Sequence, residues 1–246
     1  MTKYFTNNLN LTNLYKKPST KSEIVTQMIF GDCFSISKKN KRWLKIKIKE
    51  DGYHGYVKYR KFSKYLKPTH KVSILKSKVF KYPNSKKKIN ELSFGSKIHK
   101  LESNKKFYKF SKGWINKDDL KPISYKEKNP FKNILMFKNI KYKWGGKSFK
   151  GIDCSALIQV FLNFNNKFCP RDAKDQIKFF KKNVKLNKIM QNDIIYWKGH
   201  VALALSKKKL IHAYGPMRKT VVMEINQTIE RIRRTANLEV IGIKRL

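Results

Sequence analysis

Residues 41–49 of the chain, KRWLKIKIK, alternate basic and apolar side chains with a period of two. Such alternation fits a strand with one buried face, because successive side chains of a strand point to opposite sides. Leu44, Ile46 and Ile48 are expected on the buried face. Residues 1–125 contain no long stretch with helical spacing, and short strands such as SEIVTQMIFGD and GYHGYVKY are separated by turn residues. This half of the chain is therefore predicted to be all-β.

The all-β pattern occurs twice. Residues 12–57 and residues 72–115 each run through an apolar strand, a turn at a glycine, a central strand and a final triplet of glycine, aromatic and aliphatic residues. Two copies of a unit of this size predict two small barrels in tandem. We place them at residues 1–66 and 67–125. They resemble bacterial SH3-like domains, whose last strand often carries such a triplet.

Beyond the second unit the pattern changes. Residues 154–164, CSALIQVFLNF, place apolar side chains one, three and four residues apart, which is the spacing of a helix. A second helix is expected from Asp172 to Lys182. Five strands follow, with the sequences DIIYW, HVALALS, KLIHAYG, TVVMEI and EVIGIKRL. One or two helices followed by antiparallel strands predict an α+β domain, which we place at residues 126–246.

The chain of 246 residues has 58 Lys and Arg against 16 Asp and Glu, a formal net charge of +42. A charge of this size suggests a nucleic acid or another anionic polymer as partner. However, 50 of the 58 are Lys, whereas base and phosphate recognition favours the planar Arg, and the lysines are spread over both halves. A drift of the composition toward Lys and Asn explains the excess more simply. Nucleic acid is therefore not the expected partner, and selected binding to an anionic partner stays as the alternative.

Targeting signals and cysteine content bound the compartment. No apolar run reaches the ~18 residues of a membrane span, and the first residues, MTKYFTNNLN, lack a basic-then-apolar signal sequence. Cys33, Cys154 and Cys169 give an odd number of cysteines without the spacing of a zinc site. We therefore expect a cytoplasmic protein with at least one free thiol, no metal and no cofactor.

The segment YKWGGKSFKGIDCSALIQVF places Cys154 at the start of a helix, after a glycine-containing loop. A helix N-terminus favours the thiolate through its unpaired N–H groups and its dipole. The same N–H groups could hold the oxyanion that forms when an amide carbonyl is attacked. The alternative is a buried, inert thiol, the commoner state of a free cysteine. Taken alone, the position leaves both alternatives open.

A nucleophilic thiol also needs a base. His200 begins the segment HVALALS and His212 lies in KLIHAYG. If these strands form a hairpin that turns at residues 206–208, the two histidines project from the same face. His200 could then take the thiol proton while His212 orients its second ring nitrogen. Each histidine alone is more commonly a packed or surface residue, but the pair together with Cys154 favours catalysis.

The motifs YKWGG, DCSALIQ, PRDAKDQ, NDIIYW, GHVALAL and LIHAYG resemble, in order and spacing, the NlpC-type cysteine peptidases. These are papain-like enzymes that cut peptidoglycan stem peptides, and the resemblance covers roughly residues 130–246. With two SH3-like units ahead, the chain resembles the branch that hydrolyses γ-D-glutamyl-diamino-acid bonds in murein peptides with a free N-terminal L-Ala. The resemblance implies Cys154 as nucleophile, His200 as base and His212 as the third, orienting residue.

The resemblance also implies residues that bind the free α-amine of the substrate, namely Tyr142, Asp153 and Ser155. A carboxylate beside the nucleophile can pair with an ammonium and so measure the distance from the peptide's end to the scissile bond. A helix N-cap is an equally suitable role for Asp153. Glu23 and Tyr53 of the first SH3-like unit resemble positions that close the pocket and bind the amine, although an exposed surface pair is the more ordinary interpretation.

Three hypotheses follow. The first is a cytoplasmic γ-D-glutamyl-L-diamino-acid endopeptidase that recycles murein peptides, with the SH3-like units in the active-site wall. The second is an exported cell-wall hydrolase that uses the SH3-like units for wall binding, against which the missing signal sequence speaks. The third is a non-enzymatic binder of anionic polymers. The cysteine–histidine–histidine set argues against the third, since a pure binder has no need of it.

Overall fold

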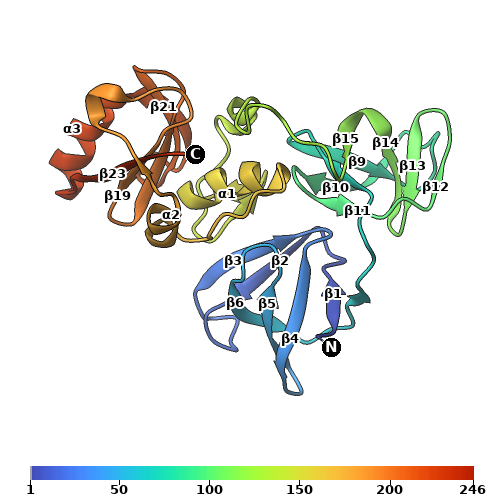
Figure 1. The fold of residues 1–246 in the computed structure, drawn as a ribbon. Coiled ribbons are helices and arrows are strands. Elements are labelled where there is room, and N and C mark those ends of the chain that lie inside the picture. Colours follow the sequence, from blue (N-terminus) through green and yellow to red (C-terminus); the bar gives the residue numbers. More distant parts are fainter. Residues whose placement is uncertain (1) are drawn as a thin grey trace.

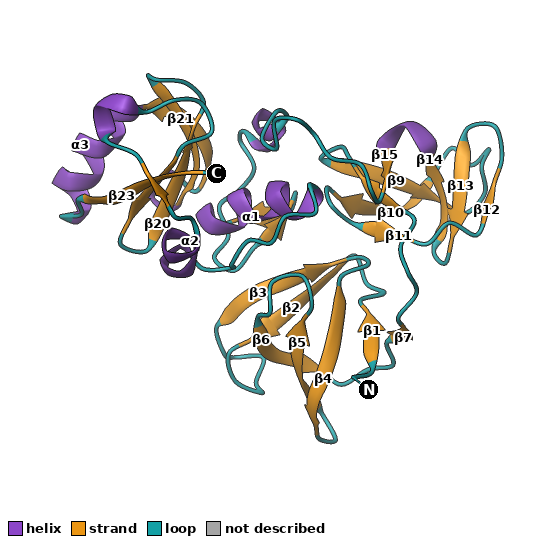
Figure 2. Ribbon diagram, viewed as in Figure 1, coloured by secondary structure: helices purple, strands orange, loops and turns teal. Residues whose placement is uncertain are grey.

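The structure is a computed structural model that describes residues 2–246, and strands dominate it (Figures 1 and 2). The elements fall into three successive groups, which we name the first β unit (residues 4–64), the second β unit (residues 70–122) and the C-terminal unit (residues 134–245). Within the described residues, no helix has the length and apolar character needed to cross a membrane.

The first β unit is one antiparallel sheet with the strand order β3-β2-β6-β5-β4-β1-β7. Strand β5 carries the alternating sequence, and Leu44, Ile46 and Ile48 are buried in the core of the unit as the alternation predicts. The strands are β1 (Tyr4–Thr6), β2 (Leu11–Tyr15), β3 (Ile24–Ile29), β4 (Cys33–Lys39), β5 (Trp43–Ile48), β6 (His54–Lys58) and β7 (Ser63–Lys64).

The second β unit has two sheets, with the orders β10-β9-β14-β13-β12 and β11-β8-β15. Phe30 of the first β unit inserts into its core against Phe110. At Gly31, where φ is +86°, an added Cβ would lie 2.1 Å from the carbonyl oxygen of Lys97, so only glycine permits this close approach. The two β units are therefore packed on each other. The elements are β8 (His70–Val72), β9 (Lys76–Phe80), β10 (Lys88–Ser93), β11 (Lys97–Ile98), β12 (Glu102–Ser103), β13 (Phe107–Phe110), β14 (Gly113–Asn116), η1 (Lys117–Asp119) and β15 (Leu120–Pro122).

In the C-terminal unit an antiparallel sheet, in the order β18-β23-β19-β20-β21-β22, carries a helix on each face. The predicted helix is present as α1 (Cys154–Phe164), which packs on one face, and α3 (Ile225–Ala236) packs on the other. The remaining elements are η2 (Ile134–Phe137), β16 (Lys147–Ser148), β17 (Gly151–Ile152), α2 (Ala173–Phe179), β18 (Lys182–Asn183), η3 (Leu186–Lys188), β19 (Ile194–Trp197), β20 (His200–Ala204), β21 (Lys209–Tyr214), η4 (Gly215–Met217), β22 (Lys219–Glu224) and β23 (Val240–Arg245).

Two predicted details of this unit are wrong. The helix expected from Asp172 to Lys182 is shorter, because the chain leaves it after Phe179 and Lys182 pairs with β23 as part of strand β18. Helix α3 is missing from the predicted elements. Its sequence, INQTIERIRRTA, does carry isoleucines with the i, i+4 and i+7 spacing of an amphipathic helix, so the signal for α3 is present.

A cluster of buried and half-buried charges joins the three units. Asp32, Glu50 and Asp51 come from the first β unit, Lys97 from the second and Lys147 from the C-terminal unit. The Nζ atom of Lys97 lies 3.4 Å from Asp32, and that of Lys147 lies 3.8 Å from Asp51. Buried charges need such partners, because an unpaired one is costly to desolvate. The cluster therefore ties the relative positions of the units to one another.

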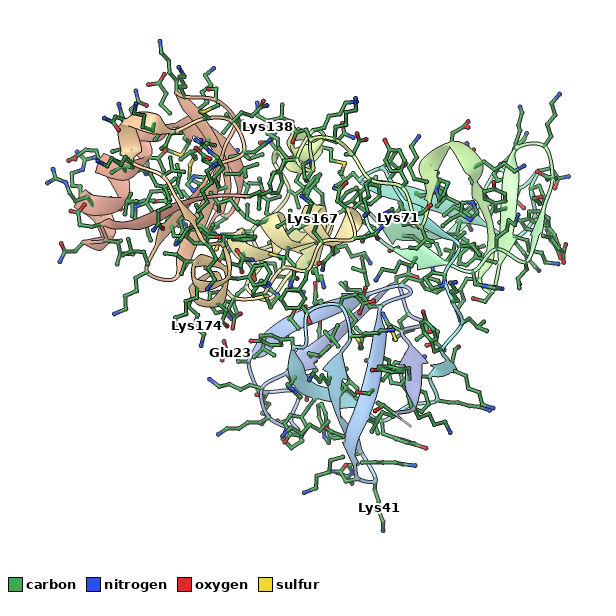
Figure 3. All side chains as sticks on the ribbon, in the orientation of Figure 1. Glu23, Lys41, Lys71, Lys138, Lys167 and Lys174 are labelled. Atoms are coloured by element: carbon green, nitrogen blue, oxygen red, sulfur yellow. The ribbon has the colours of Figure 1, made fainter. Side chains whose placement is uncertain are left out.

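The second β unit also holds one end of α1. Lys71 of β8 is 1% exposed and reaches the C-terminal end of the helix (Figure 3). Its Nζ donates to the carbonyl oxygen of Phe164 and, at 2.7 Å, to that of Tyr125. A cation at this end is favourable because it faces the negative end of the helix dipole. The end of α1 remote from Cys154 is thus fixed by another unit.

Lys71→Met should lower the free energy of unfolding by about 1–3 kcal/mol, because two buried carbonyl groups lose their donor. Lys167, which follows the same helix end and is exposed, provides the control. Lys167→Met should change the stability by less than about 0.5 kcal/mol. Urea unfolding followed by circular dichroism measures both. Equal stabilities of the two variants would contradict the role given to Lys71.

Candidate active site

Cys154 is the first residue of α1 and is 5% exposed. Asp153 is the N-cap, and its Oδ1 accepts the Ala156 N–H at 2.9 Å, while its carbonyl oxygen accepts the Leu157 N–H at 3.1 Å. Within the described residues, the N–H group of Cys154 at the helix start has no protein acceptor, whereas that of Ser155 faces the Cys154 sulfur. The Cys154 N–H is therefore in a position to stabilise a developing oxyanion.

The Asp153 carboxylate forms a buried, bidentate ion pair with Arg171. Arg171 Nη2 lies 2.6 Å from Oδ2 and Nη1 lies 3.0 Å from Oδ1. Asp153 also accepts from the Gly145 N–H at 2.9 Å and from the Ser155 hydroxyl at 3.3 Å, so that with the helix N–H it has five protein donors. Arg171 Nε donates to the hydroxyl of Thr26, in β3, at 2.7 Å. The first β unit is thereby connected to the residue that begins α1.

His200 begins β20 and His212 lies in β21, and their rings meet as their spacing predicts. Nε2 of His200 and Nδ1 of His212 are 2.9 Å apart. Tyr214 stacks on His212, with ring centroids 4.6 Å apart and an interplanar angle of 11°, and the Trp197 ring lies 5.6 Å from that of His200. These aromatic rings help to bury the histidine pair.

The contacts of His212 define the tautomers of the pair. Its Nε2 lies 3.5 Å from the sulfur of Met223, which can accept a hydrogen bond but cannot donate one. His212 therefore carries its proton on Nε2, and its Nδ1 accepts from the Nε2–H of His200. Nδ1 of His200 is then left with a lone pair, which is the state that a general base needs.

Val201, the residue after His200, connects the histidine to the nucleophile. The backbone N–H groups of Val201 and Ser155 interact with the Cys154 sulfur and favour its thiolate. Across residues 2–246, no hydrogen bond joins the thiol to the His200 ring. Catalytic hydrogen bonds of this kind often tighten only when substrate is bound. The structure therefore joins His200 to His212 and places Val201, the neighbour of His200, at the Cys154 sulfur, while the catalytic roles of the three residues stay a prediction.

Burial dominates the ionisation of these groups. It raises the pKa of Cys154 to about 12 and lowers the pKa of His200 to about 4, and burial together with the neighbouring His200 lowers the pKa of His212 to about 2. The effect of the helix N-terminus on the thiol is thus outweighed by burial and by the Asp153 charge. Each group alone is neutral at pH 7. Transfer of the thiol proton to His200 forms both charges together, and their attraction opposes the cost of burial.

The predicted substrate residues fall into two places. The backbone of Tyr142 bridges to Ile152, two residues before Cys154, and burial together with the neighbouring Cys154 and Asp153 raises the pKa of the Tyr142 hydroxyl. Glu23 and Tyr53 lie where the first β unit meets the C-terminal unit. The indole of Trp144 donates to Glu23 at 2.9 Å, although Glu23 itself remains exposed (Figure 3).

Tyr53 contacts a carboxylate that sequence reasoning did not select. Its hydroxyl donates to Asp172 at 3.1 Å, and burial raises the pKa of Asp172. Arg171, in the motif PRDAKDQ, pairs with Asp153, and Trp144 is a further contact that sequence reasoning missed. No spacing rule connects these residues. The motifs PRDAKDQ and YKWGG pointed to their segments but not to their partners.

Comparison with known proteins matches this architecture. Residues 139–235 match the NlpC/P60 family, and residues 14–61 match the bacterial dipeptidyl-peptidase Sh3 domain. The chain is 27% identical over 236 residues to a gamma-D-glutamyl-L-lysine dipeptidyl-peptidase of Bacillus subtilis, covering 85% of this chain and 79% of that protein. It is 23% identical over 243 residues to a protein of the same name from Bacillus cereus, covering 83% and 72%.

Solved structures share the fold. An NlpC/P60 family protein from Bacillus cereus superposes with a TM-score of 0.82 at 19% identity, over 99% of both chains. An NlpC/P60 endopeptidase from Photobacterium damselae gives a TM-score of 0.62 at 14% identity, over 98% of this chain and 70% of that one. Residues 139–235 are therefore an NlpC/P60 peptidase domain, and the chain that joins this domain to a bacterial SH3 domain is a homologue of the gamma-D-glutamyl-L-lysine dipeptidyl-peptidases.

Proposed function

We propose that the protein is a cysteine endopeptidase that hydrolyses the γ-D-glutamyl-diamino-acid bond of murein stem peptides with a free N-terminal L-Ala. One observation carries the proposal: Cys154 begins α1 with Val201 at its sulfur, the preceding residue His200 pairs with His212, and the first β unit reaches the same site through Thr26 and Arg171. The names of the relatives from two Bacillus species support the bond type. A second SH3-like barrel, with domain limits at residues 66 and 125, is part of the proposal.

In the proposed mechanism, His200 takes the thiol proton and the Cys154 sulfur attacks the γ-carbonyl carbon of D-Glu. The N–H group of Cys154 stabilises the oxyanion. The C–N bond then breaks, and His200 returns its proton to the leaving amine of the diamino acid. A water molecule deprotonated by His200 hydrolyses the thioester and restores the thiol, while His212 keeps the His200 ring in its competent tautomer.

The free amine of the substrate is proposed to bind toward the first β unit, where Glu23 and Tyr53 are the candidates from the sequence, whereas the other two candidates, Tyr142 and Ser155, lie beside Cys154. The five protein donors on Asp153 leave it little capacity for an ammonium. Among the described residues, the Asp172 carboxylate accepts from Tyr53 alone, and burial raises its pKa. A neighbouring cation would lower that pKa again. We therefore assign the ammonium contact to Asp172 with Tyr53, and the support of the site to Asp153.

A wall-binding role of the SH3-like units is disfavoured by how the first β unit is packed. The Lys147 N–H donates to the buried Gln27 side chain at 3.0 Å. At Gly145, where φ is +70°, an added Cβ would lie 2.4 Å from the carbonyl oxygen of Ile24, so strand β3 requires a glycine here. A tethered wall-binding module needs no such fit. Recycling of small murein peptides in the cytoplasm is therefore our proposal, with neither nucleic acid nor membrane as partner.

The substrate assignment is tested with L-Ala-γ-D-Glu-diaminopimelate and its N-acetylated form, with Cys154→Ala as the inactive control. Acetylation removes the ammonium, so the N-acetylated peptide should be cut at least about tenfold more slowly, a factor that corresponds to ~1.4 kcal/mol. Product analysis by mass spectrometry gives both rates. If the acetylated peptide or intact cross-linked wall is cut equally well, the exported wall hydrolase takes the place of the recycling enzyme.

The assignment of the ammonium to Asp172 has its own variant. Asp172→Asn should slow cleavage of the free-amine peptide while leaving the acetylated peptide nearly unchanged, because only the former loses a charge-assisted contact. Asp175→Asn, in the exposed part of α2, is the matched control and should retain the discrimination. If Asp172→Asn still distinguishes the free-amine peptide from the acetylated peptide as wild type does, a group other than Asp172 binds the ammonium.

The pH dependence follows from the buried base. His200 must be neutral to accept the thiol proton, and its pKa is lowered to about 4, so protonation removes activity only well below the usual pKa of histidine. The kcat/KM profile should therefore stay level from pH 7 to about pH 5 and fall below that. Steady-state rates with the free-amine peptide, at constant ionic strength, measure it. An acid limb near pH 6.5 would contradict a buried His200.

The role of His212 is tested by removing its acceptor. His212→Leu leaves the Nε2–H of His200 without a partner and should lower kcat by about 10²–10⁴. His212→Gln keeps a carbonyl oxygen as acceptor and should recover part of the loss. Thermal melting of both variants separates this effect from unfolding. Equal kcat values for both variants and wild type would remove His212 from the catalytic set.

A further inference from the structure

A pocket of about 420 Å³ opens beside His200, and its volume falls within the ~300–1,000 Å³ typical of small-molecule sites. Tyr142 and His200 line it together with residues of α3 and of the segment after β21. All lining residues lie between positions 142 and 238, so neither β unit contributes. In Figure 1, α3 lies at the edge of the molecule remote from both β units.

The charge of the pocket has one sign. Lys198, in the turn between β19 and β20, and Arg231, on α3, are its charged lining side chains besides His200, and no acidic residue lines it. Both are exposed, and within the part of the chain that the structure describes neither forms an ion pair. Tyr214, Ile232 and Leu238 provide apolar lining between them. Such a pocket fits a short aliphatic chain that ends in a carboxylate.

The mechanism decides which part of the substrate reaches this pocket. The leaving amine receives its proton from His200, so the part of the peptide that follows the scissile bond must lie on the His200 side of Cys154. The amine end extends the other way, toward Tyr53 and Asp172 of the opposite wall. The pocket that begins at His200 is therefore in the direction of the leaving part.

We propose that this pocket binds the leaving part of the substrate and that Lys198 and Arg231 recognise a carboxylate on it. The proposal rests on the proposed function, which sets the direction of the peptide. The carboxylate has two possible sources. One is the C-terminus of the stem peptide, and the other is the side-chain carboxylate of diaminopimelate, a group that lysine lacks. Diaminopimelate carries the side-chain ammonium of lysine and, next to it, a carboxylate, so two cationic side chains in the pocket favour diaminopimelate over lysine as the leaving residue.

The test uses four peptides, L-Ala-γ-D-Glu followed by lysine or diaminopimelate, each with a free or an amidated C-terminus. Each added carboxylate should raise the wild-type kcat/KM by up to about fivefold, since partly exposed ion pairs contribute modestly. The increase should come mainly from a lower KM. In the Lys198→Gln, Arg231→Gln double variant the peptides should converge, while the amidated lysine peptide is cut as before. Arg233→Gln is the control, because Arg233 lies on the same helix but outside the pocket and pairs with Glu230.

The outcomes separate this proposal from the function on which it rests. Equal cleavage of all four peptides by wild type overturns carboxylate recognition and leaves the proposed function intact. If the double variant still discriminates between the four peptides, the assignment of carboxylate recognition to Lys198 and Arg231 is wrong. Failure to cut any peptide overturns the proposed function and this proposal together. A preference confined to free C-termini, or to diaminopimelate, supports recognition and identifies the source of the carboxylate.

Discussion

The buried ion pair between Asp153 and Arg171 is the interaction on which the rest of the site depends. A single carboxylate caps α1, receives the Gly145 loop and neutralises a guanidinium that also reaches Thr26. Loss of either partner would leave an uncompensated buried charge, which typically costs about 3–5 kcal/mol. The position of Cys154 therefore depends on an ion pair whose contacts extend into the first β unit. This ion pair also fixes the start of α1.

This constraint also explains why the two β units belong to the enzyme. One end of α1 is fixed through Thr26 of the first β unit, and the other through Lys71 of the second. Cys154 lies on a helix that is held from both directions, and a proposed nucleophile gains from such support because small displacements of reacting groups are costly. The two β units thus support the helix that carries Cys154, and the first of them also adjoins the site through Tyr53.

Much of the site could be predicted from the sequence, for identifiable physical reasons. The strand of Ile46, the helix that begins at Cys154 and the shared face of His200 and His212 all follow from local periodicity, which depends on neighbours in the chain. The partners of Arg171 could not, since they are set by packing between segments 18 and 145 residues apart. The ionisation of the Cys154 thiol could not be predicted either, because burial in the folded protein decides whether its pKa is raised or lowered.

The packing of the two β units has a consequence for how such a chain can evolve. Phe30 lies in the core of the second β unit, and Gly31 lies against the main chain at Lys97. A recombination event that exchanged only the first unit would leave a hole in the core of the second and would also remove the hydroxyl of Thr26 from Arg171. The part of the chain that can be exchanged as a whole is therefore larger than the first β unit. We expect the wall of the site to change by single substitutions rather than by exchange of that unit.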